Sequence, residues 1–185
     1  MRELDNIFWH ALAGRQRSMT LGGEHARRYS PGLPGIVAFT DPHQPGWDEL
    51  APFCAAGERF YVADWNGPAP AGWRVEVETT MELMVWADAA PPGEEPVEAV
   101  PLGMAHAGQM VALAETTRPG PFGPRNLELG DYFGVFEGGE LVAMAGERMH
   151  AGRFREVSAI CTHPQFHGRG LARRLVQRIV AAQLR

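Results

Sequence analysis

Hydrophobic positions in the second half of the chain follow first a strand period and then a helix period. Apolar runs at 132–136 and 141–145 flank a Glu-Gly-Gly-Glu turn and predict a β-hairpin. A third apolar run at 157–162 predicts a strand that ends before Pro164, because proline cannot donate to a strand ladder. From 168 to 185 apolar residues recur every three or four positions, which predicts an amphipathic helix.

The first half of the chain has weaker patterns and many turn residues. Apolar residues at helical spacing predict a short helix over 47–56. Residues 60–63 and 73–86 are expected to be extended. In the second of these segments Val75 and Val77 alternate with charged residues, as in a half-buried strand.

A stretch rich in proline and acidic residues, 87–96, predicts a linker, and we place a domain boundary there. The prediction is an N-terminal accessory region of α+β type over 1–90 and a second domain over 97–185. In the second domain the pattern adds a strand over 97–102 and a helix over 104–117. We therefore predict an α/β fold class, with a mixed β-sheet and flanking helices.

The composition excludes several kinds of chemistry. Hydrophobic residues make up 45% of the 185 residues, enough for a substantial core. All 17 basic residues are arginine. Without lysine, the chain cannot form a lysine Schiff base or a Walker-type phosphate loop.

The charge is divided unevenly along the chain. The formal net charge is −5, which argues against nucleic acid as a partner. Residues 1–150 carry 10 Arg and 21 acidic residues, whereas 151–185 carry 7 Arg and only Glu156. This basic tail predicts a localised anion site; a solvated arginine face is the alternative.

Cysteine usage and hydropathy bear on the compartment. Cys54 and Cys161 are too few and too far apart for a disulfide framework, so we expect a reducing, cytoplasmic setting. The N-terminus lacks an apolar signal region, and no stretch approaches the roughly 20 apolar residues of a membrane span. We expect no membrane partner.

The segment 158–175 contains the most informative motif of the chain: strand, turn, glycine-rich loop and basic helix. Gly168 and Gly170 would let backbone amides approach a ligand closely, and the positive end of the helix points to the same place. Nearby arginines suit phosphate groups. A dinucleotide fingerprint is excluded because Arg173 stands where its third glycine is needed. The alternative is a glycine turn that merely begins a helix.

This segment resembles the acetyl-CoA motif of the GNAT superfamily of N-acetyltransferases, Gln/Arg-x-x-Gly-x-Gly/Ala after a strand and a proline. Two registers fit: Gln165 with Gly168 and Gly170, or His167 with Gly170 and Ala172. Aligning the proline favours the second register, in which His167 replaces the usual Gln or Arg.

The wider resemblance covers about 97–185, and from Tyr132 onward the chain is similar to the branch related to glycine N-acyltransferases. The resemblance implies a GNAT-like fold, with acetyl-CoA as co-substrate. Backbone groups of three strand residues would hold the pantetheine arm: Ile160, Cys161 and Thr162. The pyrophosphate loop would comprise His167, Gly168, Arg169, Gly170, Leu171, Ala172 and Arg173.

The resemblance also implies that a neutral amine attacks the thioester directly while a base removes its proton. Glu156 opens the motif strand and is the first candidate for this catalytic base; an ordinary surface glutamate is the alternative. Glu147 is the second candidate. The usual general acid is a tyrosine beyond the motif helix, and the chain stops at Arg185 before any such segment. We interpret this as truncation, with supply of the missing strands by a partner as the alternative.

We therefore predict an N-acetyltransferase that transfers an acetyl or short acyl group to a primary amine of a small-molecule or peptide acceptor. A non-catalytic acyl-CoA-binding sensor is the alternative, and a homodimer stays open. Cys161, His163 and His167 match no usual zinc spacing, so we expect no metal site. Cys161 is expected to be a buried, inert thiol.

Overall fold

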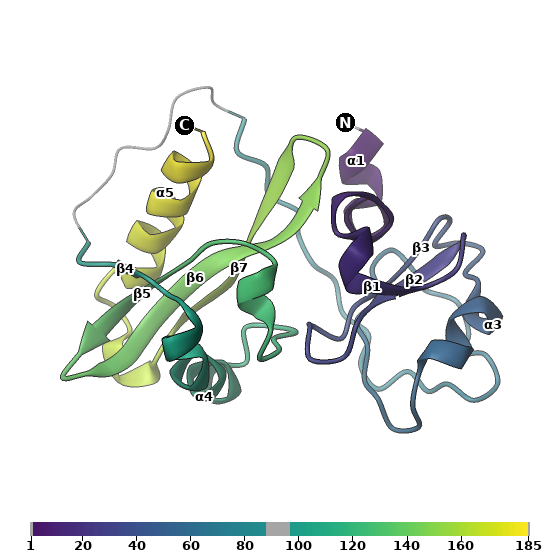
Figure 1. The fold of residues 1–185 in the computed structure, drawn as a ribbon, viewed down its shortest axis with the longest axis horizontal. Coiled ribbons are helices and arrows are strands. Elements are labelled where there is room, and N and C mark those ends of the chain that lie inside the picture. Colours follow the sequence, from purple (N-terminus) through teal and green to yellow (C-terminus); the bar gives the residue numbers. More distant parts are fainter. Residues whose placement is uncertain (1, 88–96, 185) are drawn as a thin grey trace.

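A computed structural model describes residues 2–87 and 97–184, which form an N-terminal and a C-terminal part (Figure 1). In the N-terminal part, short helical turns precede a three-stranded antiparallel sheet in the order β1-β2-β3. Its elements are α1 (Arg2–Asp5), α2 (Ile7–His10), a π-helical turn (Ala11–Arg15), a 3-10 turn (Arg17–Met19), β1 (Thr20–Gly22), β2 (Ala26–Tyr29), β3 (Val37–Phe39), α3 (Trp47–Leu50) and a second 3-10 turn (Ala51–Phe53).

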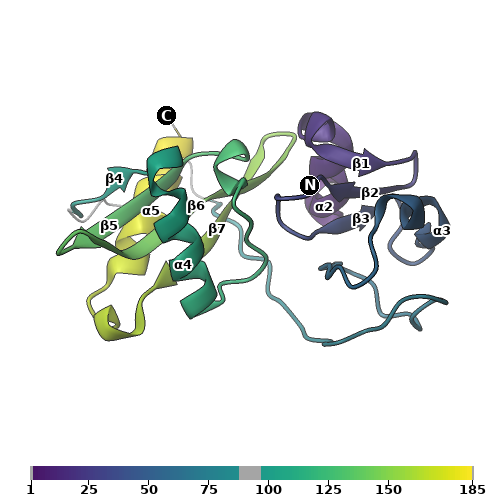
Figure 2. The ribbon, with the colours of Figure 1, turned by 60° about the horizontal axis from the view of Figure 1, so that its bottom comes forward.

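The C-terminal part is a four-stranded antiparallel sheet in the order β4-β5-β6-β7. Its elements are β4 (Val100–Pro101), α4 (Ala107–Thr117), β5 (Tyr132–Glu137), β6 (Glu140–Ala151), β7 (Phe154–Thr162) and α5 (Leu171–Gln183), with 3-10 turns at Met104–His106, Asn126–Glu128 and Pro164–Phe166. Helices α4 and α5 cover opposite faces of this sheet (Figure 2). The α/β fold class, with a sheet and flanking helices, is confirmed.

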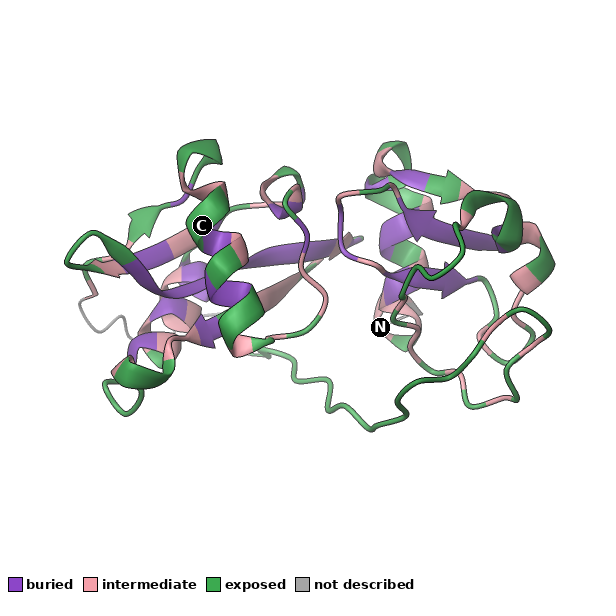
Figure 3. Ribbon diagram, turned by 90° about the horizontal axis from the view of Figure 1, so that it is seen from below, coloured by how far each residue is buried: buried purple, intermediate pink, exposed green. Residues whose placement is uncertain are grey.

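Each face of the C-terminal sheet has its own hydrophobic cluster. Met110 and Leu113 of α4 pack on one face, and Leu175 and Ile179 of α5 pack on the other. Buried residues accordingly follow the strands, while the helices are buried only on their inner sides (Figure 3). Burial of apolar area on both faces of the sheet is the main stabilising contribution.

A third hydrophobic cluster joins the two parts of the chain. Phe8, Leu12 and Tyr29 of the N-terminal part pack together with Met149 and Ala151, which lie at the far end of β6. Strand β6 is twelve residues long, so its far end, where only β7 still pairs with it, extends past β5 into this cluster. The N-terminal part therefore shares its core with the C-terminal part.

The predicted elements of the second half are observed with adjusted bounds. The strand expected over 97–102 is only β4, Val100–Pro101, and the helix expected over 104–117 begins with a 3-10 turn. The hairpin strands β5 and β6 extend further than predicted, and α5 begins at Leu171 instead of at Gly168.

The strand predicted over 73–86 is wrong. No strand is assigned there, and residues 74–87 are all exposed, forming a long exposed trace between the two parts (Figure 3). Val77 is 80% exposed and Met81 is 75% exposed. A strand pattern becomes a strand only when a neighbouring backbone pairs with it, and no described strand pairs its backbone with this segment.

Two other N-terminal predictions are only partly met. The helix predicted over 47–56 ends at Leu50 and continues as a 3-10 turn that contains Pro52. In the segment 60–63, only Tyr61 makes a strand-like bridge, to Ile36. Of the predicted linker, residues 88–96 lie outside the described part of the chain.

Candidate active site

Strand β7 lies at the end of the C-terminal sheet. Among the described residues, β6 is the only strand that pairs with β7, so the other edge of β7 presents unpaired backbone groups. Ile160, in the second half of β7, is 41% exposed. An extended ligand arm can bind to such an edge as an added strand would.

A β-bulge interrupts β7 at the predicted pantetheine-binding residues. Met144 pairs with Cys161 and Gly146 pairs with Ser158, so Ala159 and Ile160 both stand opposite one residue of β6. Ala159 has φ of 51°, in the left-handed region that alanine rarely adopts. The extra residue changes which side chains face each helix, and backbone strain of this kind is often found at functional sites.

The packing of its neighbours shows on which face of the sheet the side chain of Glu156 lies. Val157 packs with the α5 cluster, whereas Ala159 and Cys161 pack with the α4 cluster, although all three are odd-numbered positions of one strand. Side chains alternate along a strand, so Glu156 lies on the face opposite Val157, which is the α4 side.

The loop between β7 and α5 is open at both of its glycines. Gly168 has φ of 77° and Gly170 has φ of 70°, and no atom lies within 4 Å of a Cβ built on either residue. Helix α5 begins directly after Gly170, so the backbone N–H groups of its first turn, which have no carbonyl acceptor within the helix, point toward the same space. The loop and helix together form the geometry of a phosphate-binding site.

The side chains of two predicted loop residues, His167 and Arg169, contact other parts of the protein and stabilise the loop. A ring nitrogen of His167, Nε2, lies 2.8 Å from the carbonyl oxygen of Thr162, which ties the loop back to the end of β7. The guanidinium of Arg169 lies over the ring of Phe166 and 3.6 Å from a carboxylate oxygen of Glu137. The side chain of His167 thus shapes the loop, and ligand binding would rest on the backbone.

Other predicted residues have buried side chains. Cys161 and Leu171 are 6% and 8% exposed and belong to the two sheet clusters. Burial raises the pKa of the Cys161 thiol above its usual value, which disfavours the reactive thiolate. At both positions only the backbone is available to a ligand.

Glu156 forms a bidentate ion pair that the sequence did not predict. Arg148 donates from Nε to one carboxylate oxygen at 2.9 Å and from Nη2 to the other at 2.5 Å. The side chain of Arg148 is 8% exposed, and that of Glu156 is 25% exposed. Burial alone would lower the pKa of Arg148, but the hydrogen bonds and charge of Glu156 raise it, so the guanidinium stays protonated.

Buried polar residues surround Arg148. Gln16 donates from Nε2 to the Arg148 carbonyl oxygen at 2.7 Å, and the Tyr29 hydroxyl donates to Gln16 Oε1 at 2.7 Å. Tyr132, the first residue of β5, is also buried, and burial raises the pKa of its hydroxyl to about 12. Its ring fits over Gly146, where a Cβ would come within 2.5 Å of three ring atoms.

Glu147, the second candidate base, lies in a separate polar cluster. Its carboxylate accepts a hydrogen bond from Gln183 of α5 at 3.0 Å, and its Oε2 lies 3.2 Å from His150 Nε2. Glu147 is only 4% exposed. A carboxylate enclosed in this way is poorly placed to meet an external amine.

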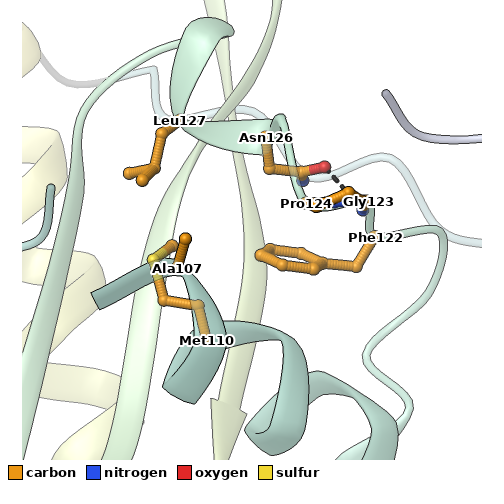
Figure 4. A pocket seen from close by; sticks show the side chains of 7 residues that line it. All are labelled: Ala107, Met110, Phe122, Gly123, Pro124, Asn126 and Leu127. Atoms are coloured by element: carbon orange, nitrogen blue, oxygen red, sulfur yellow. Dashed lines mark hydrogen bonds between the residues drawn. The ribbon is translucent and has the colours of Figure 1, made fainter. Parts of the chain in front are cut away.

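Near α4, the described residues line a small concavity and a larger one. In the first, the side chains of Phe122, Met110 and Leu127 line one small space, and Asn126 accepts a hydrogen bond from the Gly123 amide (Figure 4). These side chains fill it and leave no room for a ligand. The second, of about 350 Å³, lies between α4, the β5–β6 hairpin and the start of the glycine loop, where His163 and Phe166 line it.

No helix in the described ranges is long and apolar enough to cross a membrane. Within the same ranges, no group of three or more His, Cys, Asp or Glu side chains is arranged to hold a metal ion.

Comparison with known proteins agrees with this geometry. Residues 132–184 match the family described as FR47-like protein. A solved structure from Novosphingobium aromaticivorans, described as an acetyltransferase from the GNAT family, is 29% identical, with a TM-score of 0.83 over 97% of this chain and 80% of that chain. The chain has the fold of a GNAT acetyltransferase. The curated proteins searched contain no match to it.

On this GNAT-type scaffold, the predicted pantetheine and pyrophosphate residues lie on one continuous stretch, from the bulge of β7 to the start of α5. Three residues that connect to Glu156 were not predicted from the sequence: Arg148, Gln16 and Tyr29. A signal for Arg148 was present, because a charged residue inside the long apolar run of β6 must be paired when it is buried. Nothing in the sequence connected Gln16 or Tyr29 with Glu156.

Proposed function

We propose that the protein transfers an acetyl or short acyl group from acetyl-CoA to a primary amine. The observation that carries this proposal is the open edge of β7 with its bulge, which is followed, after one 3-10 turn, by the glycine loop at the start of α5. The GNAT-type fold suggests acyl transfer, and the loop suits the pyrophosphate of a CoA thioester.

In this proposal the loop binds through its backbone. The amides of Gly168 to Arg173 would hold the pyrophosphate, and the edge groups of Ile160 to Thr162 would hold the pantetheine arm. The positive end of α5 favours phosphate, and Arg173 is exposed near it. The side chains of His167, Arg169, Leu171 and Ala172 would shape the loop.

The chemical step is nucleophilic acyl transfer. The amine nitrogen forms a bond to the thioester carbon, the carbon–sulfur bond breaks, and the thiolate leaves with the electron pair. Glu156 would take the proton from the amine, directly or through a water, and the CoA sulfur ends as a thiol after protonation. The bidentate pair with Arg148 leaves other carboxylate lone pairs of Glu156 able to accept a proton or hydrogen bond.

Several finer expectations are part of this proposal. The acceptor would be a small molecule or a peptide, and the site would need neither nucleic acid nor a metal. The likeness to glycine N-acyltransferases rests on the motif from Tyr132 onward. Division into an accessory region over 1–90 and an acyl-CoA-binding domain over 97–185 assigns the acceptor side to the first part, and the cytoplasm remains the expected compartment.

Calorimetric titration with acetyl-CoA tests the binding step. We expect saturable heat from the folded protein; no heat at millimolar ligand would refute the proposal. A thiol-detecting assay with acetyl-CoA and a panel of primary amines tests the transfer. Release of thiol that depends on the amine supports an enzyme, whereas binding without release favours a sensor.

A further inference from the structure

A chain of buried hydrogen bonds connects the core of the N-terminal part with Glu156. The Tyr29 hydroxyl donates to Gln16, Gln16 donates to the backbone of Arg148, and Arg148 donates twice to Glu156. Gln16 is 4% exposed and Tyr29 is 1% exposed. The first three members are therefore fixed by their surroundings, and only Glu156 reaches the surface.

The link from Gln16 to Arg148 bridges residues 132 positions apart in the sequence. Gln16 follows the π-helical turn Ala11–Arg15, two of whose residues belong to the cluster shared with Met149. Arg148 is the residue before Met149. The N-terminal part thus contacts β6 by packing on Met149 and by hydrogen bonds of Gln16 to the Arg148 carbonyl before it and, at 3.5 Å, to the His150 amide after it.

A bidentate arginine fixes a carboxylate in orientation as well as in charge, because two parallel N–H groups define its plane. An exposed glutamate at a strand position would otherwise sample several rotamers. Arg148 has little freedom itself, since its backbone is held by Gln16 and its guanidinium is buried. The orientation of Glu156 is thus set from the N-terminal part.

We infer that Arg148 is a positioning residue for Glu156 and that Gln16 and Tyr29 extend this control to the N-terminal part of the chain. The catalytic side of this inference rests on the proposed function, with Glu156 as the base. The N-terminal part then does more than cover the acceptor side, because it aligns the group that receives the proton of the amine.

The first test measures the Arg148 guanidinium itself. In the wild-type protein its Nε–H, held on Glu156, should exchange slowly with solvent in ¹⁵N-detected NMR, with Arg148→Lys identifying the signal. In Gln16→Met, which keeps the length of the side chain, we expect this exchange to be about tenfold faster. Unchanged exchange would overturn the inference.

Gln109→Met is the matched control for Gln16→Met. Gln109 also bridges distant backbone groups, accepting from the Leu141 amide at 2.7 Å and donating to the Gly139 carbonyl at 3.4 Å, but it lies at the opposite end of the sheet. It should leave the Arg148 exchange rate unchanged. Should Gln16→Met fail to fold, Tyr29→Phe removes one hydroxyl only and is expected to accelerate exchange in the same direction.

The second test separates positioning from binding. With the amine that gives most thiol release, Gln16→Met should lower kcat by about tenfold, since small misplacement of a reacting group has large effects on rate. KM for acetyl-CoA should stay unchanged. An unaltered kcat would refute the catalytic role. If the wild type releases no thiol with any amine, the proposed transferase function fails instead, and the exchange test still decides whether the N-terminal part holds Arg148.

Discussion

A few charged residues are buried, and the partners that neutralise them determine how much they contribute to stability. Arg28, 4% exposed, is held by Glu58 and by backbone carbonyls, and Arg148 is held by Glu156. Arg125 makes a similar bidentate pair with Glu128 on the surface. All three pairs are bidentate but differ in burial, so they should contribute differently to the free energy of unfolding.

Replacement of Arg148 by Met should destabilise the protein by about 2–4 kcal/mol, because it removes the partner of Glu156 and the donor groups inside a polar cluster. Arg125→Met is the control and should destabilise the protein much less, since its ion pair is exposed. Urea unfolding followed by circular dichroism measures both. Equal losses for the two variants would contradict the burial argument.

His150 predicts a pH dependence of stability. Burial lowers its pKa below the ordinary value of 6.5, although Glu147 opposes this shift and Arg155 and Arg15 add to it. Above pH 6.5 the ring is neutral in both states, so its contribution is fully present. Below pH 6.5 the unfolded chain binds a proton first, and the stability falls until the lower, folded pKa is passed.

Thermal unfolding between pH 5 and pH 7 should therefore show a smaller decline for His150→Gln than for the wild type. The variant keeps a polar side chain beside Glu147 and removes the titrating group. Parallel curves for the two proteins would show that His150 does not cause the decline.

At the scale of elements, the predictions based on the clearest hydrophobic periodicity were confirmed by the structure. The β5–β6 hairpin, β7 and α5 all bury their apolar positions against a partner that is close in the sequence, so periodicity was enough to find them. Strand β2 was missed because its sequence is Ala-Arg-Arg-Tyr, and both arginines are buried through partners that no local pattern reveals.

The candidate site likewise has features that the sequence could predict and features that it could not. The glycine loop was predictable because backbone binding depends on local residue types, and Gly168 and Gly170 have the positive φ that only glycine adopts easily. The bulge at Ala159 was not predictable, since it arises from the register between β6 and β7. The same holds for Arg148, whose pairing with Glu156 needs that register.

Gly170→Val tests the loop as a binding element. The left-handed φ of 70° costs a β-branched residue about 1–2 kcal/mol, so the loop should shift and the affinity for acetyl-CoA should fall about tenfold. Gly138→Val is the matched control, with φ of 60° and open space around it in the hairpin turn. It should lose similar stability but keep its affinity in calorimetry.

The exposed segment 74–87 predicts an association hazard. Val77 and Met81 are largely exposed, and strand-patterned apolar segments that no neighbouring strand covers tend to self-associate. Val77→Glu combined with Met81→Glu should reduce light scattering during heating at high protein concentration. The melting temperature should change little, and unchanged scattering would show that this segment is not responsible.

At the scale of the whole molecule, the longest strand of the GNAT-type sheet, β6, also forms part of the hydrophobic cluster of the N-terminal part. The C-terminal sheet provides the edge and the loop, while the N-terminal part reaches the candidate base through Arg148. From the sequence, the catalytic base and the N-terminal part were expected to belong to separate domains, because the linker-like stretch 87–96 lies between them. Composition marks where a chain crosses between parts; it does not show how tightly the parts are packed.

The length of β6 has one more consequence. Met149 and Ala151 are fully buried among side chains of the N-terminal part, so neither part completes its interior when the chain is cut between them. A fragment that begins at residue 97 would expose this end of β6, and a fragment that ends at residue 90 would lose side chains that complete its own core. Exchange of either part for another would therefore also require new side chains at the last four residues of β6, because these residues form the contact with the N-terminal part.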